Sequence, residues 1–419
     1  MLGDLDPSKR KMFIVGGGIS GLLCAWRFAR AGYPTTVVEA QARWGGLIQT
    51  HQLEHGIAET ALHSFLESPL VHQFLEELRF DRVEVRKNSR ARFIVRAGQP
   101  RRLPLRPHEL LLLATRYVFT SFPHTPADEM TLKEWGDGRL GAAGTAYLLN
   151  PFLRGIYAAR PEELGVQACF PDLLRKPKKN KKLIGPRRMI AGRLGSESLI
   201  RTLVERIQET KNAALRLSTQ IETLPSDANV IMTAPAYAAA DILKTSHPQI
   251  SELLASIRYV PLVTITVFVE AASIAPSRGV GIGALFPEAE NSRTLGILFN
   301  SSAFENRVRD ETSAAAYTVL LGGSAQPEVM AETDTELLVR VDHDLRVVLG
   351  SGVRRLSAKI TRWPRALPLY SNRLASTWSA LSSELKNAPG LLLFGNYTGQ
   401  ISLRGMIETV MALPLLPTP

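Results

Sequence analysis

Apolar and polar residues form clear blocks at the start of the chain. Residues 12–15 are a short, wholly apolar run, which is typical of a buried parallel strand. An amphipathic pattern predicts a helix over residues 19–31, and Gly32 is placed to end it. A second strand is predicted over residues 35–38. The order strand, helix, strand predicts a βαβ unit.

The rest of the chain alternates between the two periodicities. Apolar positions at helical spacing predict helices over residues 68–78, 106–122, 131–135, 144–153, 197–209, 333–349 and 402–411. Apolar and β-branched runs predict strands over residues 92–95, 215–217, 230–233, 263–269, 294–299, 317–321, 359–363 and 391–394. The strands after residue 258 are numerous enough for a mixed sheet.

The turn after the first predicted strand carries three spaced glycines. Gly16 allows a tight turn, Gly18 lets the backbone approach a phosphate, and Gly21 lets the helix pack closely on the strand. Ile19 and Ser20 then lie in the first helical turn, whose N–H groups form an anion site. Because strand, glycines, helix and second strand follow in order, we expect a dinucleotide here.

The residues after the second strand specify the dinucleotide. Glu39 ends that strand, where a carboxylate binds ribose hydroxyls and repels a 2′-phosphate, so NADP is disfavoured. Arg43, Gly45 and Gly46 then place a cation and two flexible residues where a second phosphate or a ribityl chain would pass. This extension resembles that of amine oxidase-like flavoproteins and favours FAD.

A second strand, glycine turn and helix occur near the end of the chain. Gly395, Gly399 and Ile401 lie between the last predicted strand and the last predicted helix. Such a unit can return to the nucleotide domain and direct its helix dipole at the flavin, where negative charge develops on reduction. Ile221, after the strand at residue 215, is a candidate for main-chain contact with adenine.

Composition and charge narrow the class of protein. The chain has 419 residues, which is long enough for two or three lobes, and 45% of them are hydrophobic, which is ample for burial. Its formal net charge is +11. Its two cysteines, Cys24 and Cys169, favour neither a disulfide framework nor a metal cluster. No apolar stretch reaches the roughly 18 residues that span a bilayer. The polar N-terminus leads directly into the first strand, so we expect a cytoplasmic protein.

The positive charge favours an anionic partner. Much of this charge lies in residues 175–193. The prolines and glycines of this segment favour a solvated loop, and its positive charge is the alternative argument for contact with an anionic membrane. We do not expect it to bind nucleic acid. The predicted helix over residues 106–122 is unusually apolar at residues 110–113, so it either packs on a neighbour or enters lipid.

Several later segments together resemble the protoporphyrinogen oxidase family, FAD enzymes of haem biosynthesis. The resemblance covers nearly the whole chain. The segments that carry it are residues 151–159, 162–164, 169–171, 283–287, 295–304, 318–324 and 362–370.

The resemblance implies a substrate and a site. In this family a tetrapyrrole lies in a cavity beside the flavin; by position, Arg92 would bind a propionate, and Leu285 and Leu320 would hold the rings. The implied reaction oxidises protoporphyrinogen IX or coproporphyrinogen III, with hydride passing to flavin N5 and O2 restoring the flavin as H2O2 forms. No catalytic side chain and no metal is required.

Four segments depart from the family pattern. Residues 59–63 replace a Glu-x-Gly-Pro motif, residues 193–199 replace Gly-Gly-Met-x-x-Leu, residues 371–374 replace a Gly-His, and residues 399–402 are bulkier than usual. An amine oxidase or desaturase of the same superfamily, and a flavin- and porphyrin-binding protein without turnover, therefore stay as alternatives.

The expected fold combines α/β and α+β parts. A Rossmann-like FAD-binding domain is joined by a mixed-sheet substrate domain and by a helical domain that either packs internally or contacts a membrane. The FAD-binding domain is expected at residues 1–85, 191–250 and 371–419, and the substrate and helical domains at residues 86–190 and 251–370. A monomer and a homodimer are both compatible with the sequence.

Overall fold

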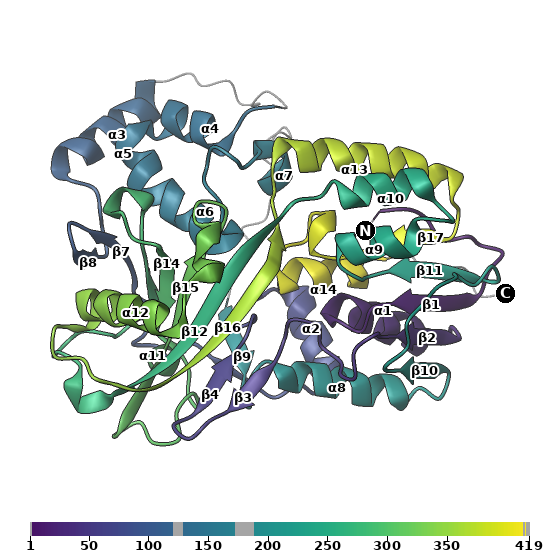
Figure 1. Cartoon of the computed structure of the whole chain (residues 1–419), viewed down its shortest axis with the longest axis horizontal. Coiled ribbons are helices and arrows are strands. Elements are labelled where there is room, and N and C mark those ends of the chain that lie inside the picture. Colours follow the sequence, from purple (N-terminus) through teal and green to yellow (C-terminus); the bar gives the residue numbers. More distant parts are fainter. Residues whose placement is uncertain (1, 120–128, 172–187, 414, 416–419) are drawn as a thin grey trace.

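Two sheets lie side by side and organise the molecule (Figure 1). The computed structural model describes residues 2–119, 129–171, 188–413 and 415. The basic stretch at residues 175–193 therefore lies largely outside the described residues, and only its end, in strand β9 (Arg188–Gly192), can be placed.

The first sheet is parallel and takes its strands from both ends and the middle of the chain. Its order is β10 (Ala213–Arg216), β2 (Thr35–Val38), β1 (Lys11–Val15), β11 (Ala228–Met232) and β17 (Leu391–Leu393). The predicted βαβ unit is confirmed, with helix α1 spanning Ile19–Arg30. The predicted return of the chain's last strand is confirmed too, because Leu393 pairs with Met232.

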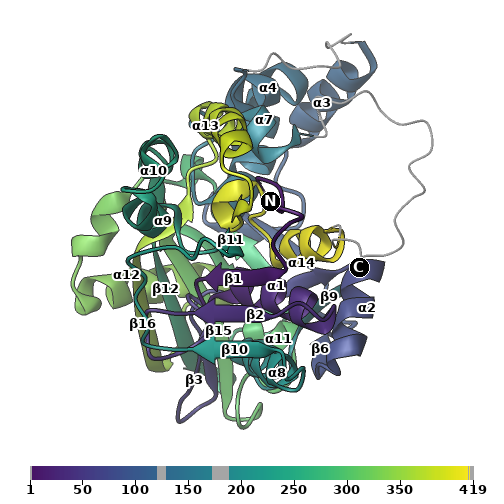
Figure 2. The ribbon, with the colours of Figure 1, turned by 90° about the vertical axis from the view of Figure 1, so that its right-hand side faces the viewer.

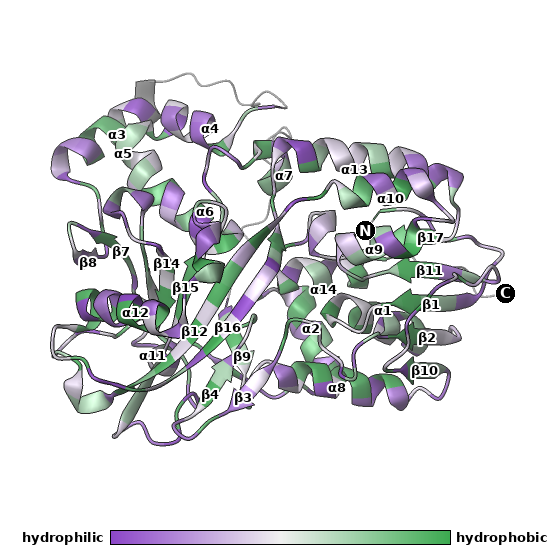
Figure 3. Ribbon diagram, viewed as in Figure 1, coloured by the Kyte–Doolittle hydropathy of each residue, from purple (hydrophilic) through white to green (hydrophobic). Residues whose placement is uncertain are grey.

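Helices cover both faces of this sheet (Figure 2). One face packs on α1, α2 (Pro69–Leu78), α8 (Glu197–Gln208) and α14 (Leu403–Met411). The other face packs on α9 (Ala236–Leu243), α10 (Pro248–Ala255) and α13 (Asn372–Glu384). Burial on both sides explains why the strands are mostly apolar, as Figure 3 shows for β11 and β17.

The second sheet is mixed and has seven strands. Its order is β16 (Arg355–Pro368), β12 (Tyr259–Glu270), β15 (Ala314–Gly322), β14 (Thr294–Leu298), β13 (Gly283–Leu285), β7 (Arg92–Arg96) and β8 (Gln99–Arg101). The predicted mixed sheet is confirmed, although β12, β15 and β16 extend beyond the predicted strands. Helix α12 (Asp334–Leu349) packs on one face.

The other face of the mixed sheet meets a helical region. This region contains α3 (Pro107–Phe119), α4 (Leu132–Arg139), α5 (Gly141–Gly144), the π-helical turn η1 (Thr145–Leu149), α6 (Asn150–Tyr157) and α7 (Val166–Cys169). A Cβ on Gly155 of α6 would lie 2.9 Å from Leu285 Cδ2, so α6 packs directly over β13. Within the described residues, no helix is long and apolar enough to cross a bilayer.

Short elements complete the fold. Two small sheets are formed by β3 (Thr50–Gln52) with β4 (Ile57–Glu59), and by β5 (Phe65–Glu67), β9 and β6 (Arg82–Glu84). Short helices are α11 (Asn300–Ala303), η3 (Ala271–Ser273), η4 (Glu288–Glu290), η5 (Pro327–Ala331), η6 (Leu385–Asn387) and η7 (Asn396–Thr398). The β3–β4 hairpin contacts the mixed sheet's loops, since Gly56 pairs with Val308.

Candidate functional site

Of the three spaced glycines in the turn between β1 and α1, Gly16 and Gly21 are sterically constrained and Gly18 is open. A Cβ on Gly21 would lie 2.0 Å from the Gly16 carbonyl oxygen, and Gly16 itself has φ of +112° with Ala234 N at 2.9 Å from its Cβ position. A Cβ on Gly18 would meet only Gly46 Cα, at 4.0 Å. The chain thus leaves space beside Gly18 for another molecule to approach the backbone.

The N-terminus of α1 faces this space. Gly18 is the N-cap residue and supplies no side-chain hydrogen bond, so the N–H groups of the first turn at Ile19, Ser20 and Gly21 lack a side-chain cap. Such a terminus attracts a phosphate through its N–H groups and the helix dipole. The Ser20 hydroxyl also lies 3.7 Å from Met406 Sδ, which brings the start of α14 next to the start of α1.

Glu39 is fixed at the end of β2 by backbone donors. Its Oε2 accepts a hydrogen bond from Gly17 N at 2.6 Å, and its Oε1 accepts one from Gln41 N at 2.8 Å. Each carboxylate oxygen retains a second lone pair. The side chain is therefore held in place and can still accept hydrogen bonds from two ribose hydroxyls.

The Arg43 turn folds back onto the glycine turn. Gly45 N donates to Gly17 O at 2.8 Å, and Arg43 Nη2 donates to Gly46 O at 2.6 Å. Gly45 and Gly46 have φ of +106° and +58°, a region that favours glycine. The structure therefore gathers Gly16, Gly18, Gly21, Glu39, Arg43, Gly45 and Gly46 at the carboxyl ends of β1 and β2.

The remaining predicted cofactor residues lie at neighbouring strand ends. Ile221 follows β10, whose connection is held to Glu39 by a hydrogen bond from Thr219 N to Glu39 O at 2.9 Å. Gly395 lies two residues after the end of β17, and Gly399 has φ of +89°. Ile401 precedes Ser402, the N-cap of α14, whose hydroxyl accepts from Gly405 N at 3.1 Å.

The three predicted substrate residues share one face of the mixed sheet. Arg92 on β7 pairs with Gly283, two residues before Leu285 on the same strand. Leu285 lies opposite Gly296, and Gly296 lies opposite Leu320. Because paired residues point to the same side of a sheet and alternate residues return to it, all three side chains project from one face.

This face is covered by α6 at β13, and at the β16 edge it is turned toward the nucleotide-binding half of the molecule. Leu262 pairs with both Gly322 and Trp363, which places the Trp363 indole on the face of Leu320. Trp363 Nε1 donates to Thr60 O at 3.2 Å, in the segment after β4. The segment that departs from the family pattern therefore contacts the mixed sheet.

Residues 59–63 contribute to a buried cluster of titratable side chains, Glu59, His63 and Arg307, that the sequence did not predict. Glu59 is only 6% exposed and accepts hydrogen bonds from Thr50 Oγ1 and Ser196 N, each at 2.8 Å. Burial raises the pKa of Glu59 to about 7. Burial, with the charge of Arg307, lowers the pKa of His63 to about 4. No local pattern could have revealed this cluster, because Arg307 comes from the distant loop before β15.

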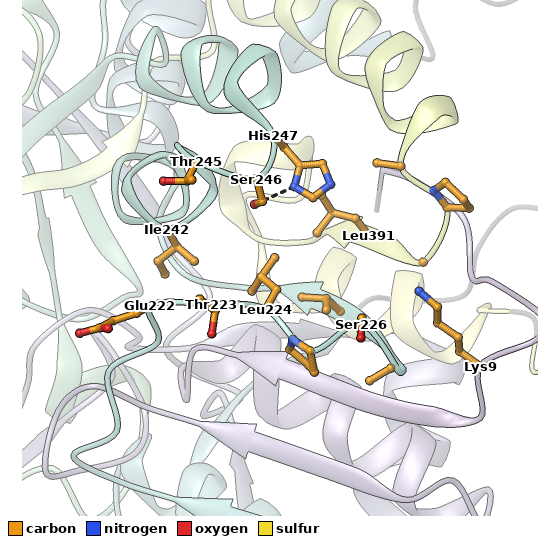
Figure 4. Close-up of a pocket in the computed structure, with 16 residues that line it drawn as sticks. Lys9, Glu222, Thr223, Leu224, Ser226, Ile242, Thr245, Ser246, His247 and Leu391 are labelled. Carbon is orange, nitrogen blue, oxygen red and sulfur yellow. Dashed lines mark hydrogen bonds between the residues drawn. The ribbon is translucent and has the colours of Figure 1, made fainter.

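A hollow of about 440 Å³ lies elsewhere on the parallel sheet (Figure 4). Lys9, Leu224, Ile242, His247 and Leu391 line it, near the amino ends of β11 and β17. Ligands of open parallel sheets bind at the carboxyl ends of the strands. This hollow is therefore separate from the glycine turn, and we do not assign it to the cofactor.

Comparison with known proteins agrees with the geometry of the glycine turn. Residues 19–411 match the family described as flavin containing amine oxidoreductase. The chain belongs to this family. It is an FAD-dependent oxidoreductase, and the open space at Gly18, the uncapped start of α1 and the fixed Glu39 carboxylate fit that cofactor.

Proteins similar to this chain include porphyrinogen oxidases. Protoporphyrinogen oxidase 2 of Arabidopsis thaliana is 27% identical, and the alignment covers 94% of this chain and 91% of that protein. Coproporphyrinogen III oxidase of Propionibacterium freudenreichii is 23% identical, and the alignment covers 87% of this chain and 82% of that protein. The structure of a candidate protoporphyrinogen oxidase from Exiguobacterium shares the fold, with a TM-score of 0.76, 20% identity and coverage of 96% and 97%.

Proposed function

We propose that this protein oxidises a porphyrinogen, either protoporphyrinogen IX or coproporphyrinogen III, to the porphyrin in haem biosynthesis. The observation that carries the proposal is the similarity to porphyrinogen oxidases over nearly the full length of both chains. The common face of Arg92, Leu285 and Leu320 supports it, since an arginine and branched apolar side chains suit a flat ligand with carboxylate arms.

The residues around the glycine turn would hold FAD. Helix α1 would bind the pyrophosphate through the N–H groups of Ile19, Ser20 and Gly21, and Glu39 would bind the ribose. Ile221 would contact adenine, and the segment of Gly395, Gly399 and Ile401 would lie along the flavin at the start of α14. When bound, FAD would supply the hydride acceptor, with O2 as the final oxidant and H2O2 as its product.

The chain's own contribution is mainly binding and orientation. Arg92 is exposed and makes no ion pair with a described residue, so its guanidinium is available to a propionate. Leu285 and Leu320 are half-buried, and Leu285 also packs on α6, so each serves the core as well as the ligand. Holding the methylene bridge beside the cofactor would provide most of the rate enhancement through proximity.

An anionic membrane surface is the partner we propose for the helical region. Leu103, Leu111 and Leu112 are 58%, 66% and 60% exposed, which is unusual for three large apolar side chains near one another in the chain. Arg101 and Arg102 are exposed beside them and would attract acidic headgroups. We therefore propose a cytoplasmic protein that contacts the membrane peripherally, as a monomer or a homodimer.

We propose the same domain division that the sequence suggests, with one sheet in each part. Residues 1–85, 191–250 and 371–419 would form the FAD-binding domain, which contains every strand of the parallel sheet. Residues 86–190 and 251–370 would form the helical and substrate domains, which contain every strand of the mixed sheet.

Anaerobic mixing with each porphyrinogen tests the reaction. Flavin absorbance near 450 nm should bleach, and admission of air should restore it with release of peroxide. Porphyrin binding without bleaching would instead support a flavin- and porphyrin-binding protein without turnover. Arg92→Ala should raise KM more than it lowers kcat, and lost flavin content would assign Arg92 to folding.

The family description favours a second candidate, an amine oxidase or desaturase-like enzyme. Bleaching by a panel of primary and polyamine substrates, with none by either porphyrinogen, would support that candidate.

A further inference from the structure

Trp363 connects the mixed sheet to the segment that follows β4. Its indole lies on the face of the sheet that carries Leu320, and its Nε1 donates to Thr60 O at 3.2 Å. The neighbouring Arg362 lies on the opposite face, where its Nη2 donates to Glu332 O at 2.8 Å, just before α12. Strand β16 is therefore fastened on both of its faces at this point.

Thr60 is fixed in turn to the Arg43 turn, residues 43–46. Its hydroxyl donates to Leu47 O at 2.6 Å and accepts from Gln49 N at 3.0 Å, and its backbone N donates to Gln49 O at 3.1 Å. Leu47 directly follows Gly46, the last residue of the turn. Thr60 is only 1% exposed, so these bonds are shielded from water. A continuous chain of hydrogen bonds thus runs from the end of the Arg43 turn through Thr60 to Trp363.

This link lies apart from two other contacts that join the β3–β4 hairpin to the mixed sheet. At the tip of the hairpin, Gly56 pairs with Val308, and Arg309 N donates to His55 O at 2.9 Å. Gly56 and Thr60 are four residues apart across β4, which is about 13 Å of extended chain. Contacts at the tip alone would leave the angle between the two parts free. A second fixed point about 13 Å away sets that angle.

We propose that Trp363 is a positioning residue: through Thr60, its indole N–H fixes the Leu320 face of the mixed sheet relative to the Arg43 turn. The inference rests on the proposed function. Transfer between a substrate on this face and a cofactor beside the turn requires close alignment, and a misplacement of about 1 Å can cost roughly 100-fold in rate. The link therefore contributes to kcat, whereas Arg92 contributes to binding.

The test compares Trp363→Phe with Trp135→Phe. The first variant keeps an aromatic ring but loses the N–H donor, and the second makes the same replacement at a half-buried tryptophan of α4 in the helical region. For each holoenzyme, flavin content, KM and the rate of anaerobic flavin reduction at saturating porphyrinogen would be measured. The fluorescence lifetime of the bound product, protoporphyrin IX or coproporphyrin III, would also be measured, because a nearby flavin quenches an excited porphyrin more strongly at shorter distance.

Trp363→Phe should lower the rate of flavin reduction about tenfold or more and lengthen the porphyrin lifetime, with KM and flavin content within about twofold of wild type. Trp135→Phe should leave all four quantities unchanged. A wild-type rate or lifetime in Trp363→Phe would overturn the proposal. So would a loss of rate that a raised KM or lost flavin explains, or an equal effect in Trp135→Phe.

Thr60→Val breaks the other end of the link and decides the question if Trp363→Phe fails to fold. Valine has nearly the same shape but lacks the hydroxyl that bonds to Leu47 O and Gln49 N. The variant should show the same slower reduction and the same longer lifetime, and wild-type values would count against the proposal. In the double variant the two effects should not add, because either break opens the same link; additive effects would contradict a shared role.

The two levels of inference fail differently. A wild-type enzyme that oxidises neither porphyrinogen would refute the proposed function. An enzyme that oxidises porphyrinogens but whose reduction rate and porphyrin lifetime do not respond to Trp363→Phe would refute only the role of Trp363.

Discussion

Replacing the buried Glu59 by Gln should stabilise the protein at alkaline pH and much less at acidic pH. The carboxyl group is 6% exposed, and burial raises its pKa from 4.5 to about 7. Gln keeps the shape and an oxygen acceptor for Ser196 N or Thr50 Oγ1 but carries no charge. The variant therefore removes the cost of burying an ion.

The expected size of the effect follows from proton linkage. Below pH 4.5 the carboxyl is protonated in both states, so the charge contributes nothing. Between pH 4.5 and 7 the unfolded state ionises first, and the native state loses stability as the pH rises. Above pH 7 the full difference of about 2.5 in pKa applies, which corresponds to about 3 kcal/mol. At pH 5 the gain from Glu59→Gln should be below about 1 kcal/mol.

Urea unfolding of the FAD-loaded protein at pH 5 and pH 8 would measure the difference, with free FAD held constant because ligand binding adds to stability. Glu197→Gln is the matched control. Glu197 Oε2 accepts a hydrogen bond from the backbone N of Thr50 at 2.9 Å, but Glu197 lies in the first turn of α8, where a negative charge is favourable. It should lower stability. An equal gain for Glu59→Gln at both pH values, or a loss at pH 8 from uncompensated Arg307, would refute the reasoning.

Four further substitutions probe the cofactor site and the helical surface. Gly18→Ala should leave the unfolding midpoint unchanged but weaken FAD at least tenfold in a flavin fluorescence titration, because its Cβ would enter the space kept for the cofactor. Gly21→Ala should destabilise the apoprotein itself, since its Cβ would lie 2.0 Å from a carbonyl oxygen; a wild-type midpoint would contradict this. Glu39→Gln should cost about 1.5 to 3 kcal/mol of FAD binding, measured in the same titration, and an unchanged Kd would remove Glu39 from the site. Leu112→Glu should reduce sedimentation with anionic vesicles at low salt, and unaltered sedimentation would argue against lipid contact. Because Leu112 is 60% exposed, the free energy of unfolding should change by less than about 0.5 kcal/mol.

The parts of the fold that sequence reasoning predicts are those determined by local periodicity. Helix α12 is amphipathic and begins with a capping box at Thr333, so both its face and its start are readable from adjacent residues. The glycine turn is readable for the same reason, since its parts follow one another within about 30 residues.

The parts that were missed depend on contacts across the chain. Strands β3 to β6 have only three residues each, too few to show a period. Strands β5 and β6 pair with the distant strand β9, and the short β3–β4 hairpin is bridged to distant Val308 through Gly56. Helix α13 is rich in serine and has little intrinsic preference for helix, yet Leu374 and Leu381 are buried against α10 and the sheet. The π-helical turn η1 interrupts a predicted regular helix, and no local rule locates it.

The same limit applies to the candidate site. Glu39 and Arg43 are recognisable because they follow a motif, whereas the pairing of Arg96 with Glu109 depends on how α3 folds over β7. Local chemistry identifies which residues could bind a ligand. Tertiary structure decides which of them are still available to do so.

The order of strands in the parallel sheet also affects how the cofactor is acquired. Strand β1 lies between β2 and β11, and β11 receives its outer neighbour, β17, from residues 391–393. Strand β17 leads directly into η7 and α14, which complete the nucleotide-binding half. During synthesis the phosphate-binding turn therefore emerges long before β17 and α14, and the nucleotide-binding half stays incomplete until those two elements have been made. We expect FAD to be captured only after β17 and α14 have been made, and chains truncated before β17 to be released without flavin.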